Sequence, residues 1–443
     1  MAESMRLRLE RAEDERLAPW ALRSAGATRR YAIEDEGRAF DYRTDYQRDR
    51  DRIVYSRAFR RLRQKAQTGF LPAYEDHRRN RLTHTLEVAQ VARTIGRALL
   101  LNEDLVEAIA LGHDLGQPPF GPAGESALDD LLSGRLDGKG GPGLGDLGGF
   151  SSAWQALRVV DRIEKRYDHP GLNLTDATRE GIVKAGRSQR GPVDRIQGFR
   201  ADRPPSLEAQ TVALADRVAS AVADLDDAIQ GGALGIEAAE KLRAVRALAK
   251  KLGKKYPAGG GKFRKANAIH RGLTHLFVTA AIFTSADALA ASSKRRDRAL
   301  RDGLVVLSAP TEALLGDLEG MLAARVHRGG EADRVDAWGR RVVLGLFAAY
   351  HADPSILEDH VLLRFKEEGG VRYLRDLPRG KTEEEVRKRY RSSPVFARLL
   401  ADYLAGMTDA FALERHGTLL KMGAVPIPSA EQLRREERGG GTT

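Results

Sequence analysis

Residues that bind divalent metal ions stand close together in one stretch of this sequence. His84 is isolated, whereas His113 and Asp114 are adjacent. Neutral imidazole and carboxylate are both good ligands for ions of the zinc, iron or manganese type. His113 and Asp114 also close an apolar run and precede a Gly/Pro-rich turn, where a helix must stop. A lone histidine is more often an ordinary core or surface residue, but an adjacent pair at a helix end beside a rigid turn suits a binding site better.

Two predicted helices would position these side chains. Apolar residues recur at helical spacing from Leu82 to Leu101, and a second run from Leu105 to Leu111 follows Asp104, which can serve as an N-cap. Two packed helices can bring His84 to the His113–Asp114 pair. A distal aspartate would complete the set. Asp216 is the best candidate, although an aspartate on a helix normally faces solvent.

Composition narrows the class of protein. The 443 residues contain 73 Lys and Arg against 62 Asp and Glu, a formal net charge of +11, which favours an anionic substrate or partner over a neutral one. An ordinary solvated basic surface is the alternative. The absence of cysteine excludes a disulfide framework and a thiolate site, and fits a cytoplasmic protein. No run approaches the roughly 20 apolar residues that span a membrane, so we expect no membrane partner.

The periodicity along the chain predicts an all-α protein, a helical bundle with peripheral helices and flexible Gly-rich loops. No convincing series of strands and no internal repeat is visible. We expect an N-terminal arm over residues 1–50, a core over 51–235, a C-terminal helical region packed on that core over 236–425, and a disordered tail over 426–443. The Gly-rich segment 133–149 is predicted to be a mobile surface loop.

Two segments are rich in cations. Residues 51–65 place many arginines on one predicted helix, and residues 250–265 contain seven cations and no acid around a glycine run. Either segment could bind phosphates or single-stranded nucleic acid, although a solvated basic face is the commoner outcome.

Six segments, taken in order, carry a resemblance to a known family. They are RDRIVYSRAFRRLRQKAQTGF, DHRRNRLTHTLEVAQVARTI, EAIALGHDLGQPPFGPAGE, GLNLTDATREGI, EAQTVALADRVA and DYLAGMTDAFAL. Together they resemble the deoxynucleoside-triphosphate triphosphohydrolase (dGTPase) family of HD-domain hydrolases. The resemblance runs from about Leu17 to His416, so it is far more specific than the His-Asp pair alone.

The resemblance implies roles for particular residues. The metal ligands would be His84, His113, Asp114 and Asp216, and the ion could be Mg, Mn, Fe or Zn. Arg81 falls where the family contacts the triphosphate, and one helical turn before His84 it projects to the same face. Gln67 and Asp224 fall where sugar contacts are expected, and we add Arg217, beside Asp216, to the substrate-binding set. The reaction would cleave a deoxynucleoside triphosphate into deoxynucleoside and tripolyphosphate, in a homo-oligomer.

The chain departs from the family pattern around the proton-transfer positions. The family's loop typically reads HDLGHPPFGHAGE, whereas this chain has Gln117 and Pro122 at the second and third histidines. Ser151 and Ser152 replace residues of the family's GFEHN segment, and Glu125 alone remains as a catalytic acid/base candidate. Because glutamine cannot titrate and proline has no side-chain proton, we expect slow turnover.

Three functions therefore stay open at this point. The first is a divergent deoxynucleoside triphosphate triphosphohydrolase. The second is a non-catalytic nucleotide sensor that uses the same pocket. The third is an HD phosphohydrolase that acts on another phosphorylated substrate.

Overall fold

A computed structural model describes most of the chain. The described residues are 4–33, 42–67, 79–137, 141–185, 204–253, 256, 261–293, 303–328, 330–378 and 382–423. They form two compact units: a larger unit of residues 1–117 and 151–336, and a smaller unit of residues 118–150 and 337–443. Each unit has its own buried apolar core.

The described residues form helices and loops without a β-strand, and only two isolated bridges occur, so the all-α prediction is confirmed. The larger unit contains α1 (Met5–Arg16), α2 (Asp45–Val54), α3 (Arg57–Arg61), α4 (Arg81–Ala98), α5 (Glu103–Gly112), α7 (Ser152–Arg158), α8 (Asp176–Ala185), α9 (Leu207–Gln230), α10 (Ile236–Glu240), α11 (Arg243–Leu252), α12 (Lys262–Ser293) and α13 (Ala309–Arg325). Short 3-10 and π-helical turns, Leu62–Gln64 and Val159–Ile163, follow α3 and α7.

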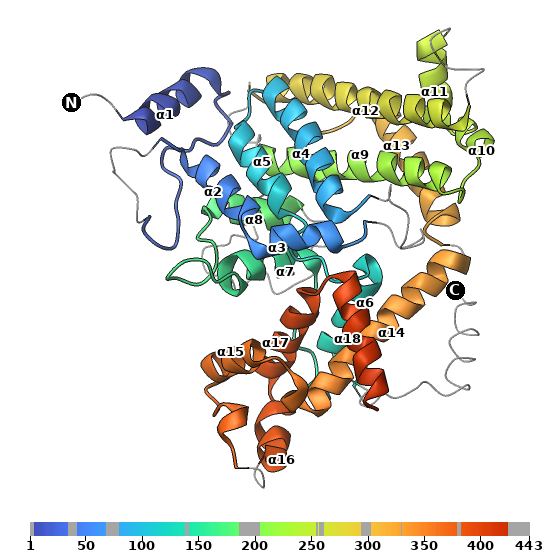
Figure 1. The fold of residues 1–443 in the computed structure, drawn as a ribbon. Helices are drawn as coiled ribbons and strands as arrows, with labels where there is room; N and C mark the ends of the chain where they lie inside the picture. Colours follow the sequence, from blue (N-terminus) through green and yellow to red (C-terminus); the bar gives the residue numbers. More distant parts are fainter. Residues whose placement is uncertain are drawn as a thin grey trace. The chain divides into compact units, whose positions relative to one another are not determined.

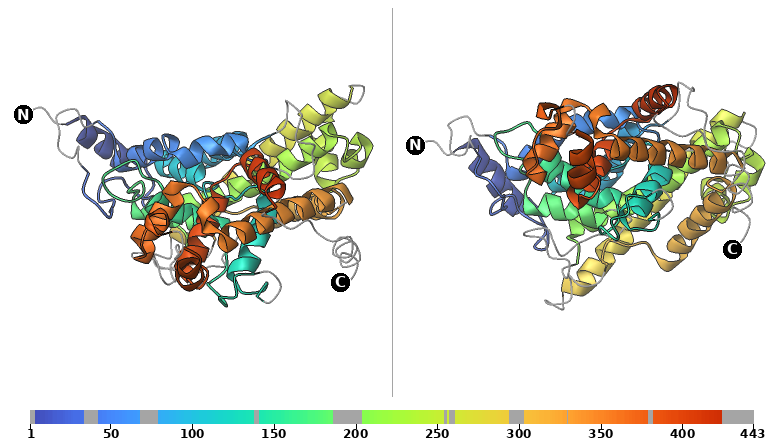
Figure 2. Two further views of the ribbon diagram at one scale, coloured as in Figure 1. Left: turned by 60° about the horizontal axis from the view of Figure 1, so that its bottom comes forward. Right: turned by 90° about the horizontal axis from the view of Figure 1, so that it is seen from below.

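Helix α9 is the centre of the larger unit. It packs against α4, α5, α8 and α12. Figure 1 shows α4 and α5 crossing it while α12 runs alongside, and Figure 2 gives the same helices from two further directions. The apolar side chains of α9 between Leu214 and Ile229 are buried, and so are almost all the other side chains of this helix. A helix buried on every side must also bury its polar residues, and these include Asp216.

Side-chain caps fix where the site helices begin. Asn80 accepts a hydrogen bond from the Thr83 N–H at the start of α4 (2.9 Å), and the Thr83 hydroxyl accepts one from the Asn80 N–H (3.1 Å). The predicted cap of α5 is wrong by two residues. Asn102, not Asp104, caps this helix by accepting from the Leu105 N–H, while Asp104 lies in the first turn. Such caps satisfy N–H groups that have no partner inside the helix.

The smaller unit packs its helices around aromatic side chains. Phe365 lies 4.7 Å from Tyr390 and 4.9 Å from Phe396, measured between ring centroids, and all three rings are fully buried. The helices are α6 (Gly121–Leu132), α14 (Gly330–Ala352, which begins in the larger unit), α15 (Asp359–Gly369), α16 (Thr382–Glu385), α17 (Pro394–Ala405) and α18 (Asp409–Lys421), with short turns at Pro354–Ile356, Leu374–Asp376 and Val386–Tyr390.

The two units divide the chain at places that differ from the predicted boundaries. Residues 236–336 belong to the larger unit, because side chains such as Leu248 and Leu273 are buried in its core. Residues 118–150 belong to the smaller unit, because Leu128 and Phe150 are part of the other core. The predicted tail over 426–443 lies outside the described residues.

The Gly-rich segment after α6 is anchored by hydrogen bonds where it is described. The Asp137 carboxylate accepts from the N–H groups of Gly143 and Gly145, and Arg398 donates to the carbonyl oxygens of Leu147 and Gly149. Residues 138–140 lie outside the described part of the chain.

Helix α12 corrects one expectation from the sequence. Its segment from Lys262 to Ala291 is long and apolar enough, by length and composition, to cross a membrane. Polar and charged residues, Arg271 and Asp287 among them, interrupt the apolar ones, so no uninterrupted apolar run is visible in the sequence. Leu273, Phe277 and Ala281 nevertheless lie fully buried in the core of the larger unit, where α12 packs on α9.

Candidate metal centre

The predicted ligands come from three helices that pack against one another. His84 lies on α4, His113 is the C-cap residue of α5 with Asp114 directly after it, and Asp216 lies on α9. All four side chains are buried. One ligand atom of each of His84, His113 and Asp114 lies within 4.8 Å of the others, so these three could hold one ion.

Asp216 joins this group from the opposite helix. Its Oδ1 lies 3.0 Å from His84 Nε2 and 3.8 Å from His113 Nε2. The Ser220 hydroxyl, one turn later on α9, donates to the same oxygen at 3.2 Å and orients the carboxylate. The structure therefore brings together four side chains that the sequence separates by as many as 132 positions.

The hydrogen bonding of His113 leaves one ring nitrogen available to the centre. Its Nδ1 lies 2.6 Å from the carbonyl oxygen of Ala110, and because a carbonyl only accepts, Nδ1 must carry the proton. Its buried Nε2 has no hydrogen-bond partner among the described residues and lies 3.6 Å from Asp114 Oδ1. A backbone carbonyl that fixes the tautomer in this way is the usual support of a metal-binding histidine. The residues present thus fit a divalent ion.

Arg81 forms an ion pair with one of the four candidate ligands, Asp114. Its Nη1 donates to Asp114 Oδ2 at 3.0 Å, and both side chains are buried. Burial alone would raise the pKa of Asp114, but the charge of Arg81, together with the two histidines, lowers that pKa to about 2. Asp114 is therefore a carboxylate at any physiological pH, which is the form that binds a cation.

Two supporting residues were not predicted from the sequence. Lys65 is buried, and its ammonium group donates to the backbone carbonyl of Gln117, the third residue after Asp114. Gly116 lies so close to α7 that a Cβ atom there would stand 2.1 Å from the Ala156 nitrogen and from the Ser152 carbonyl oxygen. Both residues fix the loop after Asp114. The only local signals were a lysine in a cation-rich segment and one glycine among several.

The predicted substrate-binding residues have different surroundings. Gln67 lies two residues after Lys65, which ends the turn that follows α3. The Lys65 carbonyl accepts a hydrogen bond from the Arg81 N–H at 2.9 Å, and this bond joins the segment to the start of α4. Asp224 is buried on α9, with Oδ2 3.0 Å from His327 Nε2. Arg217, however, is engaged by Glu312 and Glu319 of α13. The structure thus directs Arg217 toward α13 instead of the ligand group.

The residues at the altered family positions fall in both units. Gln117 belongs to the larger unit, and so do Ser151, the N-cap residue of α7, and Ser152, its first residue. Pro122 and Glu125 lie on α6 of the smaller unit, Pro122 exposed and Glu125 half-buried. His77, a histidine that could replace the missing ones, lies outside the described residues.

Comparison with known proteins adds an independent line of evidence. The HD domain model matches residues 81–221, which span all four ligands. A deoxyguanosinetriphosphate triphosphohydrolase-like protein of Syntrophus aciditrophicus is 37% identical over 418 residues, 92% of this chain and 94% of that protein. Proteins of the same name from Ralstonia pickettii and, numbered 1, from Mesorhizobium japonicum are each 35% identical, over 92% and 86% of this chain and 96% and 92% of their own lengths. The chain belongs to the deoxyguanosinetriphosphate triphosphohydrolase-like family of HD-domain proteins.

Membership of the triphosphohydrolase-like family confirms the resemblance seen in the sequence. A second model, the phosphohydrolase-associated domain, matches residues 371–418 of the smaller unit. Its family and its two matching domain models therefore place this chain among the phosphohydrolase-related proteins. HD domains are metal-dependent, and the buried histidines and aspartate of this chain offer a matching set of ligands.

Proposed function

We propose that this protein is a metal-dependent triphosphohydrolase of deoxynucleoside triphosphates, and that it turns over slowly. The observation that carries the proposal is the convergence of His84, His113, Asp114 and Asp216 in one buried group. The names of its relatives point to a deoxynucleoside triphosphate as the substrate. A buried set of two imidazoles and two carboxylates is the ligand chemistry expected for a divalent ion that acts on phosphates.

The four ligands would hold one divalent ion between α4, α5 and α9. When bound, such an ion polarises a phosphoryl oxygen and lowers the pKa of a water molecule. The hydrogen bond from His113 Nδ1 to the Ala110 carbonyl leaves Nε2 unprotonated and orients the ring, so that Nε2 can bind the ion. Arg81 would orient the triphosphate, because its guanidinium has five N–H donors and the bond to Asp114 uses only one of them.

The sugar would be contacted by Gln67 and Asp224. Gln67 Oε1 and Asp224 Oδ1 are buried, and neither has a hydrogen-bond partner among the described residues. Each oxygen can accept a hydrogen bond from a hydroxyl group, and leaving it unpaired costs about 1–3 kcal/mol. The ion pairs of Arg217 with Glu312 and Glu319 would have to open before it could reach a substrate.

The proton balance explains why turnover should be slow. Water attacks the α-phosphorus, the bond from that phosphorus to the 5′ oxygen breaks, and the 5′ oxygen must receive a proton. Gln117 and Pro122 cannot supply one, and a serine hydroxyl such as that of Ser151 or Ser152 is a weak acid. A missing general acid typically costs about 10²- to 10⁴-fold in rate. Glu125 remains as the proposed donor.

The test is a product analysis. Metal-loaded protein is incubated in ¹⁸O-labelled water with each of the four deoxynucleoside triphosphates, and phosphorus NMR follows the products. We expect slow formation of tripolyphosphate that carries the label on one terminal phosphate. Orthophosphate or pyrophosphate as the first product would contradict the proposal. Saturable nucleotide binding without any product would instead favour a nucleotide sensor, which the loss of the histidines at Gln117 and Pro122 makes the second candidate function.

A further inference from the structure

Helix α12 keeps an apolar face in solvent although its opposite face is buried. Figure 1 shows it at the edge of the larger unit, with α9 beneath it. Leu273 and Phe277 lie in the core, yet only 28% of the apolar stretch of this helix is buried. The ring of Phe283 is 68% exposed. Helices of globular proteins normally turn a polar face outward, so an exposed apolar face marks a contact site.

The exposed side chains of α12 follow a single row. Arg271, His275, Phe283 and Asp287 are exposed, and Thr279 in the middle of the row is half-buried. We call these five residues, each four positions after the last, the α12 ridge. Such a row is inclined to the helix axis, and helices most often pack by laying these rows into each other's grooves. The ridge is about 24 Å long, at about 1.5 Å per residue.

The surface beside the ridge suits a second helix. No residue between Arg271 and Asp287 carries a formal charge. The neighbouring row contains Val278, Ile282 and Ala286, and none of these three side chains is buried. A row of apolar side chains that water still reaches can gain free energy only by packing against another apolar surface.

The charges of the ridge stand at its two ends and have opposite signs. Arg271 and Asp287 are the only formally charged residues of α12 after Lys265, and neither forms an ion pair with another described residue. Thr279 lies midway between them. A two-fold axis at Thr279 therefore sets Arg271 of each copy beside Asp287 of the other copy. A parallel arrangement would instead bring like charges together, so the ridge is complementary to itself only when antiparallel.

The charges around α12 agree with a two-fold arrangement. Helix α11 packs beside the N-terminal half of α12, where a Cβ atom on Gly272 would meet Leu248, and it exposes the cations Arg246 and Lys250. A two-fold axis lays the N-terminal half of one α12 on the C-terminal half of the other. The cations of the two copies are thereby kept apart and face the acidic end of the partner's ridge. The mostly basic residues 294–298 lie outside the described part of the chain.

From these observations we propose that α12 is the contact surface of a two-fold symmetric dimer, in which two copies of this chain pack their α12 ridges antiparallel. Phe283 of each copy fills the groove beside the partner's ridge. A lipid bilayer suits this helix less well, because its other face is buried on α9. One crossing of two helices buries less than the roughly 800 Å² per partner of a standard interface, so we expect reversible association at micromolar concentrations.

The experiment measures sedimentation velocity of the full-length protein over a range of concentrations, without metal or nucleotide. Arg271→Asp and Asp287→Arg each set like charges against one another at both ends of the interface, so each should weaken the dimer about tenfold or more. An equimolar mixture of the two variants should associate like the parent, because their opposite charges meet at both ends. The double variant Arg271→Asp/Asp287→Arg should also recover the parent's affinity.

Two phenylalanines of α12 provide a matched pair for the apolar contact. Phe283 and Phe263 are 68% and 67% exposed, but only Phe283 lies between the two charges of the ridge. Phe283→Ser should weaken the dimer about tenfold through the loss of buried apolar area, whereas Phe263→Ser should associate like the parent. Circular dichroism checks that each variant is folded.

Several results would overturn the proposal. These are a parent that stays monomeric at every concentration, association that neither charge reversal changes, or a mixture of the two variants that associates no better than either alone. Binding of the parent to phosphatidylcholine vesicles, lost in Phe283→Ser, would assign the face to a membrane instead. If the parent forms a larger assembly, the same variants must reduce its size. The assay follows no turnover, so its outcome is independent of the proposed hydrolysis.

Discussion

At the scale of single residues, the contact between Arg81 and Asp114 links substrate binding to the metal centre. Both side chains are buried and lie 3.0 Å apart. Arg81→Ala should weaken the binding of dGTP about 10- to 100-fold, because a hydrogen bond to a charged group contributes about 1.5–3 kcal/mol. Calorimetric titration measures this effect. Arg93→Ala, on the same helix but 41% exposed at its side chain, should bind dGTP like the parent. An unchanged affinity in Arg81→Ala would remove Arg81 from the site.

Glu125 is the proposed source of the proton for the leaving 5′ oxygen. Glu125→Gln keeps the shape of the side chain but cannot titrate, so residual tripolyphosphate formation should fall by a further 10²-fold or more. Nucleotide affinity and bound metal should not change. Rapid turnover by the parent that also survives Glu125→Gln would show that another group donates the proton. The interpretation of Gln117, Pro122, Ser151 and Ser152 would then be wrong.

Residue types were a good guide where the chemistry depends on the side chain itself. Ligand chemistry, the adjacency of two candidates at a helix end and the family resemblance together marked His84, His113, Asp114 and Asp216 as candidate ligands, and the fold brings them together. The surroundings of Arg217 could not be predicted, because its partners lie about a hundred positions later on α13. Ion pairs between distant helices leave no local pattern in a sequence.

At the scale of elements, the close approach of α7 to the loop after Asp114 gives a test of how the site is supported. Gly116→Ala would place a Cβ atom 2.1 Å from two backbone atoms of α7, and backbone cannot move aside as a side chain can. We expect a loss of roughly 1–3 kcal/mol in the free energy of unfolding, as in other overpacked sites, and weaker metal binding. Chemical denaturation and metal analysis measure the two effects.

The control for this substitution is another helical glycine. A Cβ atom at Gly316 of α13 would meet no atom within 4 Å, so Gly316→Ala should stabilise the protein by about 0.5–1 kcal/mol through its better helix propensity. If Gly116→Ala were as stable as the parent and held metal equally well, α7 would have no supporting role at the site.

Helices were predictable from periodicity and caps, but their exact starts and burial were not. Ser206, of a residue type that favours helix starts, caps α9 by accepting from the Ala209 N–H at 3.2 Å. Asn102 caps α5, and Asp104 lies in the first turn of the same helix. Asn and Asp are both good N-caps, and an acidic residue is also favourable inside the first turn, so the sequence alone did not show which of the two caps the helix. The burial of Asp216 followed from α9 being enclosed by other helices, and the pattern of α9 alone cannot reveal this.

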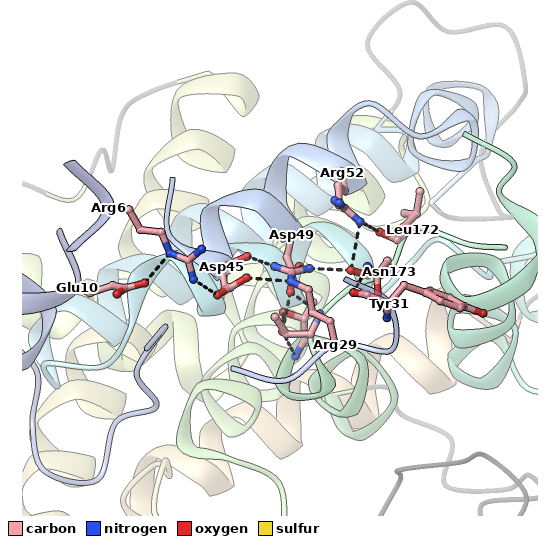
Figure 3. Close-up of polar contacts among 11 residues, drawn as sticks. Arg6, Glu10, Arg29, Tyr31, Asp45, Asp49, Arg52, Leu172 and Asn173 are labelled. Atoms are coloured by element: carbon pink, nitrogen blue, oxygen red, sulfur yellow. Dashed lines mark hydrogen bonds and ion pairs between the residues drawn. The ribbon is translucent and has the colours of Figure 1, made fainter. Parts of the chain in front are cut away.

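At the scale of the whole molecule, buried ion pairs join the N-terminal segment that follows α1 to helix α2 within the larger unit. Arg29 contacts Asp45 at 2.9 Å and Asp49 at 2.5 Å, and side-chain exposures are only 5%, 7% and 0% (Figure 3). Arg29→Met should lower the free energy of unfolding by about 3–5 kcal/mol, because it leaves two buried carboxylates without their shared cation. Urea titration is the measurement.

Arg43→Met serves as the control for Arg29. The side chains of Arg43 and its partner Asp51 are 34% and 29% exposed, so this substitution should cost less than about 1 kcal/mol. Equal losses in the two variants would mean that the buried network does not hold the N-terminal segment in place.

The division into units could not be predicted from the sequence. The polypeptide leaves the larger unit after residue 117, returns at residue 151 and leaves it again after residue 336. A Gly/Pro-rich turn lies at the first of these crossings and a Gly-rich segment ends near the second, but both are also typical of ordinary surface loops, and the third lies inside helix α14. The two cores are distinguished only by which apolar residues touch in space. Assembly into a homo-oligomer and a cytoplasmic location both stay predictions.

Bound metal tests the central claim most directly. Protein purified without a histidine tag should contain one divalent ion per chain by elemental analysis, and His113→Ala and Asp216→Asn should each lose it. Asp224→Asn is the matched control, because Asp224 lies on the same helix and is as buried as Asp216, 9% against 8% exposed. It should keep the ion. Unchanged metal content in His113→Ala and Asp216→Asn would contradict the assignment of the centre and the function built on it.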